Sequence, residues 1–415
     1  MRNKKRSLQL SALIISAVLT VTSSDFTAAS TVCIKDCAVS LGPRANPRVP
    51  LLISKSRGYL IPVNSRSIVV FDGESIQVIC PGNNNQIVGK KSNEINAICK
   101  CDGLFEYPKF VPFTLNCTQP LTETVLETNE KCGSFSDSNI VKIGWSLKEE
   151  NFLTQIEICF SKSRLLAEYS RHTLRGSGVY YRDRDSRRRS FKVDKYFLHQ
   201  KPPISRTYSK VIQQDTLTNL LGDKRITEKY IGGWGSTSYL VRGHLTPDAD
   251  FSLQTWQDAT YHHLNVVPQW MAFNNGNWKV LEGAIRVKAM RPFARNLTIY
   301  TGTYGILNLP DVNNNEVAVY LLEGQKLPVP EYVWKVVIDE ENSEAVGFVL
   351  VNKPASCSPS KEKPLCNDIC HNIMWVTWSS RTDSRKGIIY CCSLNSLRKI
   401  IPSLPLIPKV KLLEN

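Results

Sequence analysis

At its centre the chain reads Ser238-Tyr-Leu-Val-Arg-Gly-His-Leu-Thr-Pro-Asp-Ala-Asp250. The start of this segment predicts an extended strand, and the Gly-His pair followed by polar residues predicts that the strand ends there. His244 then lies at a strand terminus, where Gly243 allows a ligand to approach the backbone closely. Histidine gains and loses a proton near neutral pH, which makes His244 a candidate general base. The chain has six histidines, and any one of them alone is more often structural or exposed than catalytic, so His244 depends on its context.

The sequence that follows predicts a second strand and a helix. The strand is expected over the apolar residues Leu264–Val267, and the helix from about Asn275 to Met290. Within that helix Val280, Ala284 and Val287 repeat at i, i+4 and i+7, which predicts that this face is buried. Further strands are expected at Leu297–Thr301, Ala318–Leu322, Tyr332–Val337 and Ala345–Val351.

The segment Asn274-Asn-Gly-Asn-Trp-Lys-Val-Leu-Glu282 carries groups suited to a cation and a phosphate. The amide oxygen of Asn274 can bind a hard cation, and Mg²⁺ accepts a single protein ligand because it prefers oxygen and keeps most of its waters. On a regular helix Glu282 lies roughly 80° round from Asn274, and Arg286 lies one turn further. Taken singly, Asn274 reads as an N-cap, and Glu282 with Arg286 reads as a surface ion pair.

Together these segments supply what hydrolysis of a phosphodiester requires. A base must activate water, a cation must neutralise charge on the phosphorus centre, and the leaving oxygen must be stabilised. The pattern consists of three ordered motifs, Arg242-Gly-His244, Asn265-Val-Val-Pro-Gln269 and Asn274–Glu282, with 30 residues from His244 to Asn274. They resemble the ββα-metal family of DNA/RNA non-specific endonucleases, and the resemblance covers roughly residues 145–400.

Within that family the chain looks most like an arthropod branch, the secreted gut double-stranded-RNA nucleases and the salivary endonucleases of blood-feeders. This closer likeness rests on Leu245-Thr-Pro-Asp-Ala-Asp-Phe251 and on Pro330-Glu-Tyr-Val-Trp-Lys335. The resemblance implies an α+β fold, in which a ββα-metal core has a mixed or antiparallel sheet flanked by helices. It also implies Mg²⁺ as the cofactor, with Mn²⁺ able to substitute, and DNA or RNA as a substrate that is cut without regard to sequence.

The resemblance implies a role for each polar residue of the motifs. His244 would be the general base, and Asn274 would be the magnesium ligand. Asn265 and Glu282 would orient the metal-bound waters. The site would therefore be assembled from one strand end and one helix start.

The resemblance also implies that arginines hold the phosphate. Arg286 would contact it, and Arg242 would support the site. Arg189, in Arg-Ser-Phe-Lys-Val-Asp194, matches another phosphate-binding arginine of the family less closely. One position departs from the family pattern, because Val241 stands where an acidic residue often precedes Arg-Gly-His. We expect this difference to alter the rate or the support of the site rather than to abolish activity.

Residues 1–30 predict a secretory signal peptide. A basic start is followed by the apolar run Leu8–Val21 and by the small residues Ala28–Ser30. No later stretch reaches the roughly 18 apolar residues of a membrane span, so we expect a secreted, extracellular protein with no membrane partner. Asn116 and Asn296 begin glycosylation sequons, which fits secretion. The net charge of +15 favours polyanionic partners such as nucleic acid, heparin-like glycans or anionic membranes.

All thirteen cysteines follow the expected signal peptide, eight between Cys33 and Cys159 and five between Cys357 and Cys392. In an oxidising compartment most of them should form disulfides, and the odd number leaves at least one thiol free or paired between chains. Cys366-Asn-Asp-Ile-Cys370-His371 resembles a zinc motif. Its spacing and the expected compartment favour disulfides instead.

The composition divides the rest of the chain into two parts. Residues 31–140 are Cys-rich and predict a small β module stapled by disulfides, and residues 141–405 would form the endonuclease domain. The module's strands are expected at Tyr59–Val63, Ser67–Phe71 and Ser75–Cys80. The basic cluster Arg182–Arg189 is, taken alone, a solvated loop.

Three functions fit these observations to different degrees. The leading hypothesis is an active nuclease. The second is a secreted nucleic-acid-binding protein on the same fold with weak or no catalysis, which Val241 and the high charge motivate. The third is a glycan- or membrane-surface adhesin, which leaves the three motifs unexplained. Magnesium-dependent cleavage separates them, whereas the choice between DNA and RNA, strandedness, oligomeric state and tissue stay open.

Overall fold

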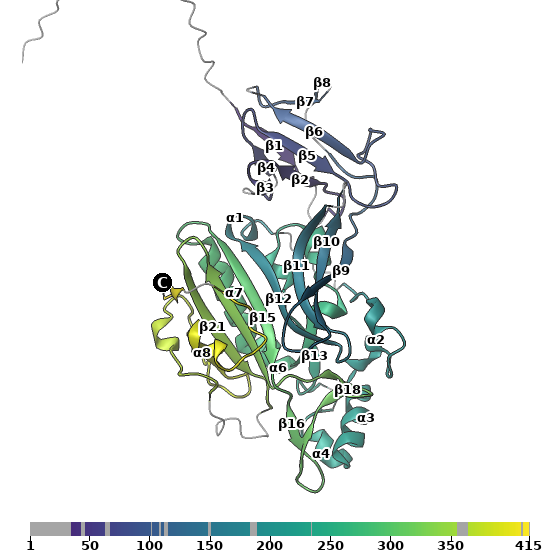
Figure 1. Ribbon diagram of the computed structural model, residues 1–415, viewed down its shortest axis with the longest axis vertical. Helices are drawn as coiled ribbons and strands as arrows, with labels where there is room; N and C mark the ends of the chain where they lie inside the picture. Colours follow the sequence, from purple (N-terminus) through teal and green to yellow (C-terminus); the bar gives the residue numbers. More distant parts are fainter. Residues whose placement is uncertain are drawn as a thin grey trace, which may run out of the picture.

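The computed structural model describes residues 35–42, 46–62, 67–100, 102–107, 109–111, 115–147, 151–182, 189–233, 235–354, 364–407 and 410–414. The expected signal peptide, residues 1–30, lies outside these ranges, and so does most of the basic cluster, residues 183–188. The described chain forms a small β module followed by a larger part with both strands and helices (Figure 1).

The N-terminal module consists of two sheets. The larger has six strands in the order β3-β2-β5-β6-β7-β8, and β1 pairs with β4 separately. The strands are β1 (Cys37–Ser40), β2 (Leu51–Ser54), β3 (Gly58–Tyr59), β4 (Ser67–Val70), β5 (Ser75–Ile79), β6 (Glu94–Cys99), β7 (Phe105–Tyr107) and β8 (Lys109–Val111). Buried and exposed side chains alternate along β6, as expected for a sheet with one face in the core. The disulfides Cys37–Cys99 and Cys80–Cys117 close the module.

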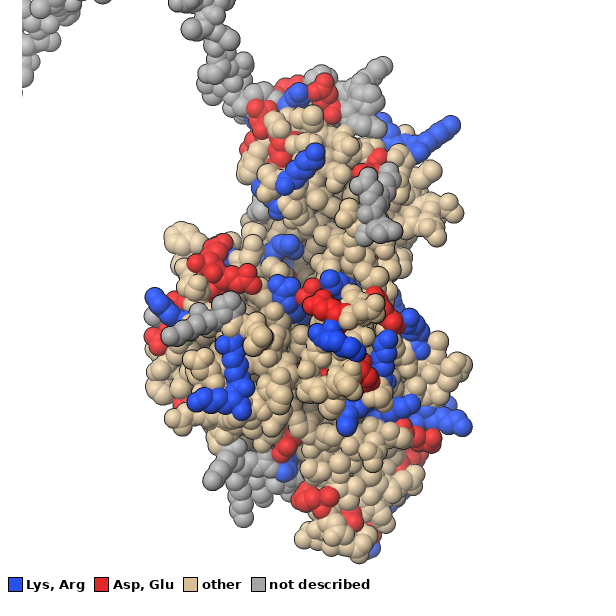
Figure 2. All heavy atoms as spheres, viewed as in Figure 1, with Lys and Arg blue, Asp and Glu red and all other residues tan. Residues whose placement is uncertain are grey.

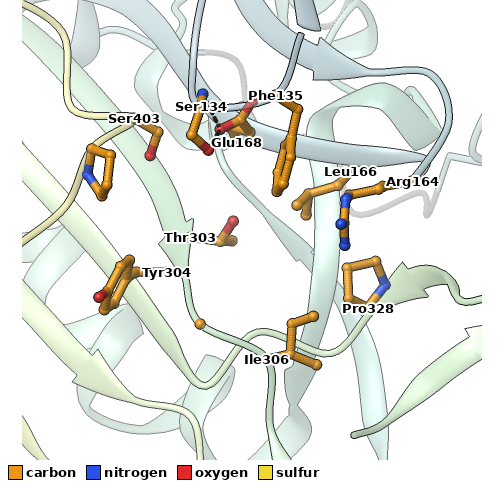
Figure 3. Close-up of a pocket in the computed structure, with 12 residues that line it drawn as sticks. Ser134, Phe135, Arg164, Leu166, Glu168, Thr303, Tyr304, Ile306, Pro328 and Ser403 are labelled. Carbon is orange, nitrogen blue, oxygen red and sulfur yellow. Dashed lines mark hydrogen bonds between the residues drawn. The ribbon is translucent and has the colours of Figure 1, made fainter. Parts of the chain in front are cut away.

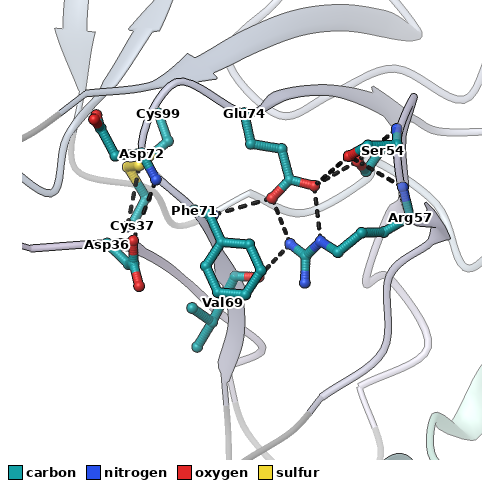
Figure 4. A network of polar contacts seen from close by, with 10 residues as sticks. Asp36, Cys37, Ser54, Arg57, Val69, Phe71, Asp72, Glu74 and Cys99 are labelled. Atoms are coloured by element: carbon teal, nitrogen blue, oxygen red, sulfur yellow. Dashed lines mark hydrogen bonds and ion pairs between the residues drawn. A yellow bond between two sulfur atoms is a disulfide. The ribbon is translucent and has the colours of Figure 1, made fainter.

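A polar network holds the hairpin of β2 and β3 in place (Figure 4). Glu74 accepts hydrogen bonds from Arg57 Nε at 2.8 Å and from the backbone N–H of Phe71 at 3.0 Å. Burial alone would raise the pKa of Glu74, but these bonds and one from Ser54 lower it to about 2. The guanidinium of Arg57 also lies 4.3 Å from the ring centroid of Phe71. The position of Tyr59, two residues after Arg57, is therefore fixed relative to the rest of the module.

The larger part is built on a nine-stranded sheet with the order β22-β21-β20-β15-β12-β11-β10-β9 and with β23 beside β21. Its strands are β9 (Thr124–Lys131), β10 (Ser138–Ser146), β11 (Phe152–Ser161), β12 (Leu166–Arg175), β15 (Asn296–Tyr304), β20 (Tyr332–Asp339), β21 (Glu344–Val351), β22 (Ile389–Cys392) and β23 (Lys411–Leu412). Neighbours are antiparallel except β21 and β23, which are parallel, so the sheet is mixed. Strands β9 and β10 begin inside residues 31–140, and the proposed domain division stays a prediction.

Short hairpins and helices accompany the sheet, which gives the α+β architecture that the family resemblance implies. The hairpins pair β13 (Leu240–His244) with β14 (Val266–Trp270), β16 (Asn308–Pro310) with β17 (Glu316–Ala318), and β18 (Tyr320–Leu322) with β19 (Lys326–Pro328). The helices are α1 (Gly176–Val179), α2 (Ile204–Thr207), α3 (Lys210–Leu221), α4 (Lys224–Glu228), α5 (Gln254–Asp258), α6 (Met271–Phe273), α7 (Lys279–Met290) and α8 (Leu394–Arg398). The two strands β13 and β14 followed by α7 form the ββα unit.

Strand β20 separates two hydrophobic cores. Val333 and Val337 belong to the core that includes β13, β14 and α7. Trp334 and Val336 belong to the second core, together with Leu397 of α8. Every side chain of β20 is buried, the two charged ones included, so the strand lacks the alternation of buried and exposed residues seen in β6.

Helix α7 lies where the sequence predicts it, but its buried face is a different one. Leu281 and Ile285 are buried, whereas Val280 and Val287 are 39% and 48% exposed and Ala284 is only partly buried. The predicted face was wrong by one position. Both sets of residues repeat at helical spacing, so periodicity alone did not separate them.

The chain also does not enter α7 as one regular helix. Gly276 has φ −92° and ψ −125°, which are not helical values, and the regular helix begins at Lys279. The angle of roughly 80° between Asn274 and Glu282 assumed a continuous helix and is therefore wrong. Asn274 instead lies on a distorted turn that precedes the helix.

The described cysteines support the disulfide interpretation over zinc. Cys366–Cys392 and Cys370–Cys391 are disulfides, so these thiolates are not free to bind a metal. The fifth described disulfide, besides these and the two of the module, is Cys132–Cys159. Cys33, Cys101 and Cys357 lie outside the described residues. Within the described ranges, no helix has the length and apolar character needed to cross a bilayer.

Candidate active site

The hairpin of β13 and β14 brings the first two motifs side by side. Gly243 pairs with Val267, and His244 pairs with Val266. A Cβ atom on Gly243 would lie 2.4 Å from Oε1 of Gln269, whose side chain is buried. The glycine of Arg-Gly-His is therefore required by the packing of the neighbouring strand.

Arg242 and His244 are two residues apart on β13, so they lie on the same face of the strand. Both contact the ring of Phe191, whose centroid lies 5.3 Å from the Arg242 guanidinium and 5.1 Å from the His244 ring. Arg242 also donates a hydrogen bond to the carbonyl of Ser205 at 3.0 Å and lies over the ring of Tyr208. Arg242 is thus fixed beside the histidine by backbone and aromatic contacts.

The imidazole of His244 has one nitrogen that no neighbour uses. Its ring lies 5.1 Å from Phe191 and 5.1 Å from Tyr261. Its Nε2 atom is buried and has no hydrogen-bond partner among the described residues. Burial lowers the pKa of His244, and the negative charge of nearby Asp248 opposes this effect. The ring is therefore neutral near neutral pH and can accept a proton.

Asn265 lies between the end of β13 and the start of β14, and it joins the two. Its side chain is fully buried and accepts a hydrogen bond from Thr246 N at 3.0 Å. Its amide group donates to the carbonyls of Thr246 at 2.8 Å and Thr260 at 2.9 Å. Both amide hydrogens of Asn265 are thus bound to the loop backbone, and its proposed action on metal-bound water stays a prediction.

A buried network connects this loop to α7. Arg286 donates to Asp250 at 2.8 Å, and the other oxygen of Asp250 lies 2.9 Å from Nε2 of His172. Nδ1 of His172 lies 3.1 Å from the hydroxyl of Thr246, two residues after His244. Burial would raise the pKa of Asp250, but the bond from His172 and the charge of Arg286 lower it to about 2. The sequence prediction missed His172 and Asp250 as site residues, although Asp250 ends the first motif segment.

The charge of a buried lysine acts on the pKa of Glu282. Burial raises the pKa of Glu282 to about 7, although the charges of Lys335 and Arg286 lower it. Lys335 is 1% exposed, and its ammonium donates to the hydroxyl of Thr301 and lies 5.3 Å from the ring of Trp278. The sequence prediction missed Lys335, whose only signal is one charged residue inside an apolar strand.

The turn that carries Asn274 is held by the C-terminal part of the chain. The side chain of Asn277 donates to the carbonyls of Ser380 at 2.9 Å and Gly387 at 2.7 Å. A Cβ atom on Gly276 would lie 2.5 Å from the carbonyl oxygen of Lys386. Within the described ranges the side chain of Asn274 makes no hydrogen bond, so its amide oxygen is available to a hard cation.

The charges place the end of β13 and the start of α7 at one site. The negative charge of Asp248 raises the pKa of His244, opposing the effect of burial. The same charge raises the pKa of Glu282, in the same direction as burial. Asp250, two residues further along the chain, forms an ion pair with Arg286, and its charge also raises the pKa of Glu282. Asp248 and Asp250, which lie on one loop, thus connect His244 to Glu282 and Arg286 through charge interactions and a hydrogen bond.

Two predicted positions lie at the edge of this neighbourhood. Nε of Arg189 lies 2.9 Å from Asp258. The positive charge of Arg189 also lowers the pKa of Tyr261, whose ring packs against His244. Arg189 is therefore held near the site, and its contact with phosphate stays a prediction. Val241 lies on the opposite face of β13 from Arg242 and His244.

Acidic side chains accompany part of the basic surface. On the face shown in Figure 2, Lys and Arg side chains are interspersed with Asp and Glu. On the sheet, Lys162 lies 3.1 Å from Glu127, and Arg171 lies 3.0 Å from Glu157. These pairs neutralise part of the positive charge on this region of the sheet.

A pocket lies apart from the motif residues (Figure 3). Its carboxylate, Glu168, accepts hydrogen bonds from the backbone N–H and hydroxyl of Ser134 and from the hydroxyl of Ser138. Its cation, Arg164, lies 4.4 Å from the ring centroid of Phe135. None of the predicted site residues lines this pocket, so it is separate from the site built on β13 and α7.

The sequence matches one protein family and several insect proteins. The profile of the DNA/RNA non-specific endonucleases matches residues 136–397. The chain is 28% identical over 378 residues to a "Salivary endonuclease" of Lutzomyia longipalpis, which covers 88% of this chain and 83% of that one. It is 25% identical over 379 residues to a "Salivary endonuclease" of Culex quinquefasciatus, covering 89% and 90%. A crystal structure of the EndoG/EndoGI complex matches with 17% identity and a TM-score of 0.30, over 48% of this chain and 72% of that one.

Proposed function

Since the chain belongs to the DNA/RNA non-specific endonuclease family, we propose that this nuclease is a secreted, magnesium-dependent enzyme that hydrolyses phosphodiester bonds of DNA, RNA or both without sequence specificity. The observation that carries the proposal is the neutral imidazole of His244. It has an unpartnered nitrogen and lies at a strand end near Asp248, whose charge also raises the pKa of Glu282. The names of the insect relatives motivate the further proposal that the enzyme is salivary.

In the proposed reaction His244 takes a proton from the attacking water. A base must be unprotonated before it can act, and the lowered pKa of His244 keeps it so at neutral pH. Phe191 and Tyr261 hold the ring from two sides, so little reorientation is needed when the substrate arrives.

The donor set at the start of α7 fits magnesium. Asn274 would hold the ion through its amide oxygen, and Glu282 would add a carboxylate close by. When bound, Mg²⁺ neutralises charge on the phosphoryl oxygens as the phosphorus centre becomes five-coordinate. Mn²⁺, which also takes oxygen ligands, would substitute.

Positive side chains would hold the phosphate without reading bases. Arg286 is fixed by Asp250, so its guanidinium presents a charge of set position next to Glu282. Arg242 and Arg189 would extend this charge along the strand and the neighbouring loop. Contacts to phosphate carry no base information, which accounts for cleavage without sequence specificity.

The test is digestion of plasmid DNA and of RNA with Mg²⁺, with Mn²⁺ and with a chelator. Cleavage is expected with either metal and is expected to stop with the chelator. His244→Ala should abolish cleavage and leave nucleic-acid binding nearly intact. His371→Ala, at an exposed histidine, should cut at the wild-type rate. Binding without magnesium-dependent cutting would instead favour the alternative, a nucleic-acid-binding protein on the same fold.

A further inference from the structure

Residues that precede the family match contact the loop between the first two motifs. We define the active-site loop as residues 245–265, which connect β13 to β14. Two residues upstream of the family match, which begins at residue 136, reach this loop. One is Tyr59 of β3, and the other is Glu123, which directly precedes β9.

The first contact is an aromatic stack. The rings of Tyr59 and Trp256 are 4.0 Å apart at their centroids with an angle of 28° between their planes. Tyr59 is 7% exposed and Trp256 is 4% exposed, so the stack is buried. Nearby, a Cβ atom on Gly178 would lie 2.7 Å from Ile61 and 2.8 Å from the hydroxyl of Ser252. The glycine thus lets the N-terminal module pack tightly against the loop.

Trp256 is connected to the site through ring contacts. Its ring lies 5.9 Å from that of Phe251, and Phe251 lies 5.6 Å from the ring of His172. Phe251 directly follows Asp250, which binds both His172 and Arg286. A shift of Trp256 would therefore move the residues that hold Arg286.

The second contact is a buried ionic cluster near the C-terminal end of the loop. Oε1 of Glu123 lies 2.7 Å from Nε2 of His262, and Lys192 pairs with the same carboxylate. Nδ1 of His262 lies 2.6 Å from Asp194. The carbonyl of His262 accepts a hydrogen bond from the N–H of Asn265, so the cluster adjoins the residue that joins β13 to β14.

We propose that Tyr59 and Glu123 are positioning residues of the nuclease, so that the segment before the family domain is needed for catalysis and not only for folding. The proposal rests on the proposed nuclease function. The two residues fix the active-site loop at its middle and near its C-terminal end, and the loop in turn contacts His244 and binds Arg286. The network of Arg57 and Glu74 keeps the β2–β3 hairpin rigid, which gives Tyr59 a fixed place from which to act (Figure 4).

The test compares Tyr59→Ala with Tyr59→Phe and with Val88→Ala. Val88 is an apolar residue of the same module whose side chain is 54% exposed. With a fluorogenic oligonucleotide and Mg²⁺, Tyr59→Ala should lower kcat by about 10- to 100-fold, because small displacements of catalytic groups have effects of that size. KM should stay nearly unchanged, and Tyr59→Phe and Val88→Ala should behave like the wild type. Rates are measured well below each variant's melting temperature.

Hydrogen exchange provides a readout that does not need activity. Tyr59→Ala should exchange faster over the active-site loop than the wild type, with β21 unchanged, and Tyr59→Phe should not. A wild-type kcat in Tyr59→Ala overturns the proposal, and so does unchanged exchange of the loop. If the wild-type protein cuts no substrate, the proposed function fails, and exchange of the loop still decides whether Tyr59 holds it.

Discussion

Replacing Asp250 with asparagine removes the negative charge of the buried network that joins Arg286 to His172. Folding lowers the pKa of this carboxyl from 3.8 to about 2, and a shift of that size corresponds to about 2 kcal/mol. Loss of the partner also leaves Arg286 buried without a counter-charge, an effect of about 3–5 kcal/mol where it is complete. Arg286 is 11% exposed and keeps a neutral oxygen to bind, so we expect Asp250→Asn to lose about 2–4 kcal/mol.

The assay is urea unfolding of the wild type and Asp250→Asn across a range of pH. Because the folded pKa is lowered, the contribution of Asp250 is present above pH about 4 and is lost as the pH falls toward 2. The difference between the two proteins should therefore shrink on acidification. The matched control is Asp383→Asn, whose partner Arg385 is 83% exposed, and which should change stability little. Equal stabilities at pH 7, or a difference that grows in acid, would show that the network does not work as described.

Three further predictions concern the packing and charge of the site. Gly243→Ala should fold but cut at least about tenfold more slowly, because its Cβ atom collides with the β14 strand; Gly283→Ala on α7, where the added Cβ meets open space, should cut normally in the same plasmid assay. Burial would lower the pKa of His262, but Asp194 and Glu123 raise it; the wild type should thus lose stability as the pH rises from about 6.5 through that raised pKa, and Glu123→Gln should lose less in urea unfolding. Cleavage at low substrate concentration should weaken steeply between about 50 and 200 mM salt, and a flat response would contradict binding through phosphates.

The strand end at His244 and the existence of α7 could be predicted from the sequence because both depend on local patterns. The strand end at Arg-Gly-His, the turn after it and the periodic helix are each determined by a short stretch of sequence. The buried face of α7 could not be predicted, because Val280 and Leu281 begin equally good helical repeats. Contact with the sheet decides between them, and that contact is not local.

The residues that support the site, His172 and Lys335, could not be predicted from the sequence for the same reason. His172 lies 78 residues before Asp250, and no spacing rule joins two residues on different elements. Lys335 gave one signal, a charge inside an apolar strand, and its partner Thr301 is 34 residues away on the neighbouring strand. The non-helical backbone at Gly276 could not be predicted, because the residues around it also fit the start of a regular helix.

The turn that carries Asn274 takes its shape from carbonyl groups more than a hundred positions later, at Ser380 and Gly387. A fragment that stopped before Ser380 would retain all three sequence motifs, yet would lack the carbonyl groups that shape the turn at Asn274. Gene models, splice forms and expression fragments of such chains should therefore be judged by whether their C-terminal tail is intact as well as by their motifs.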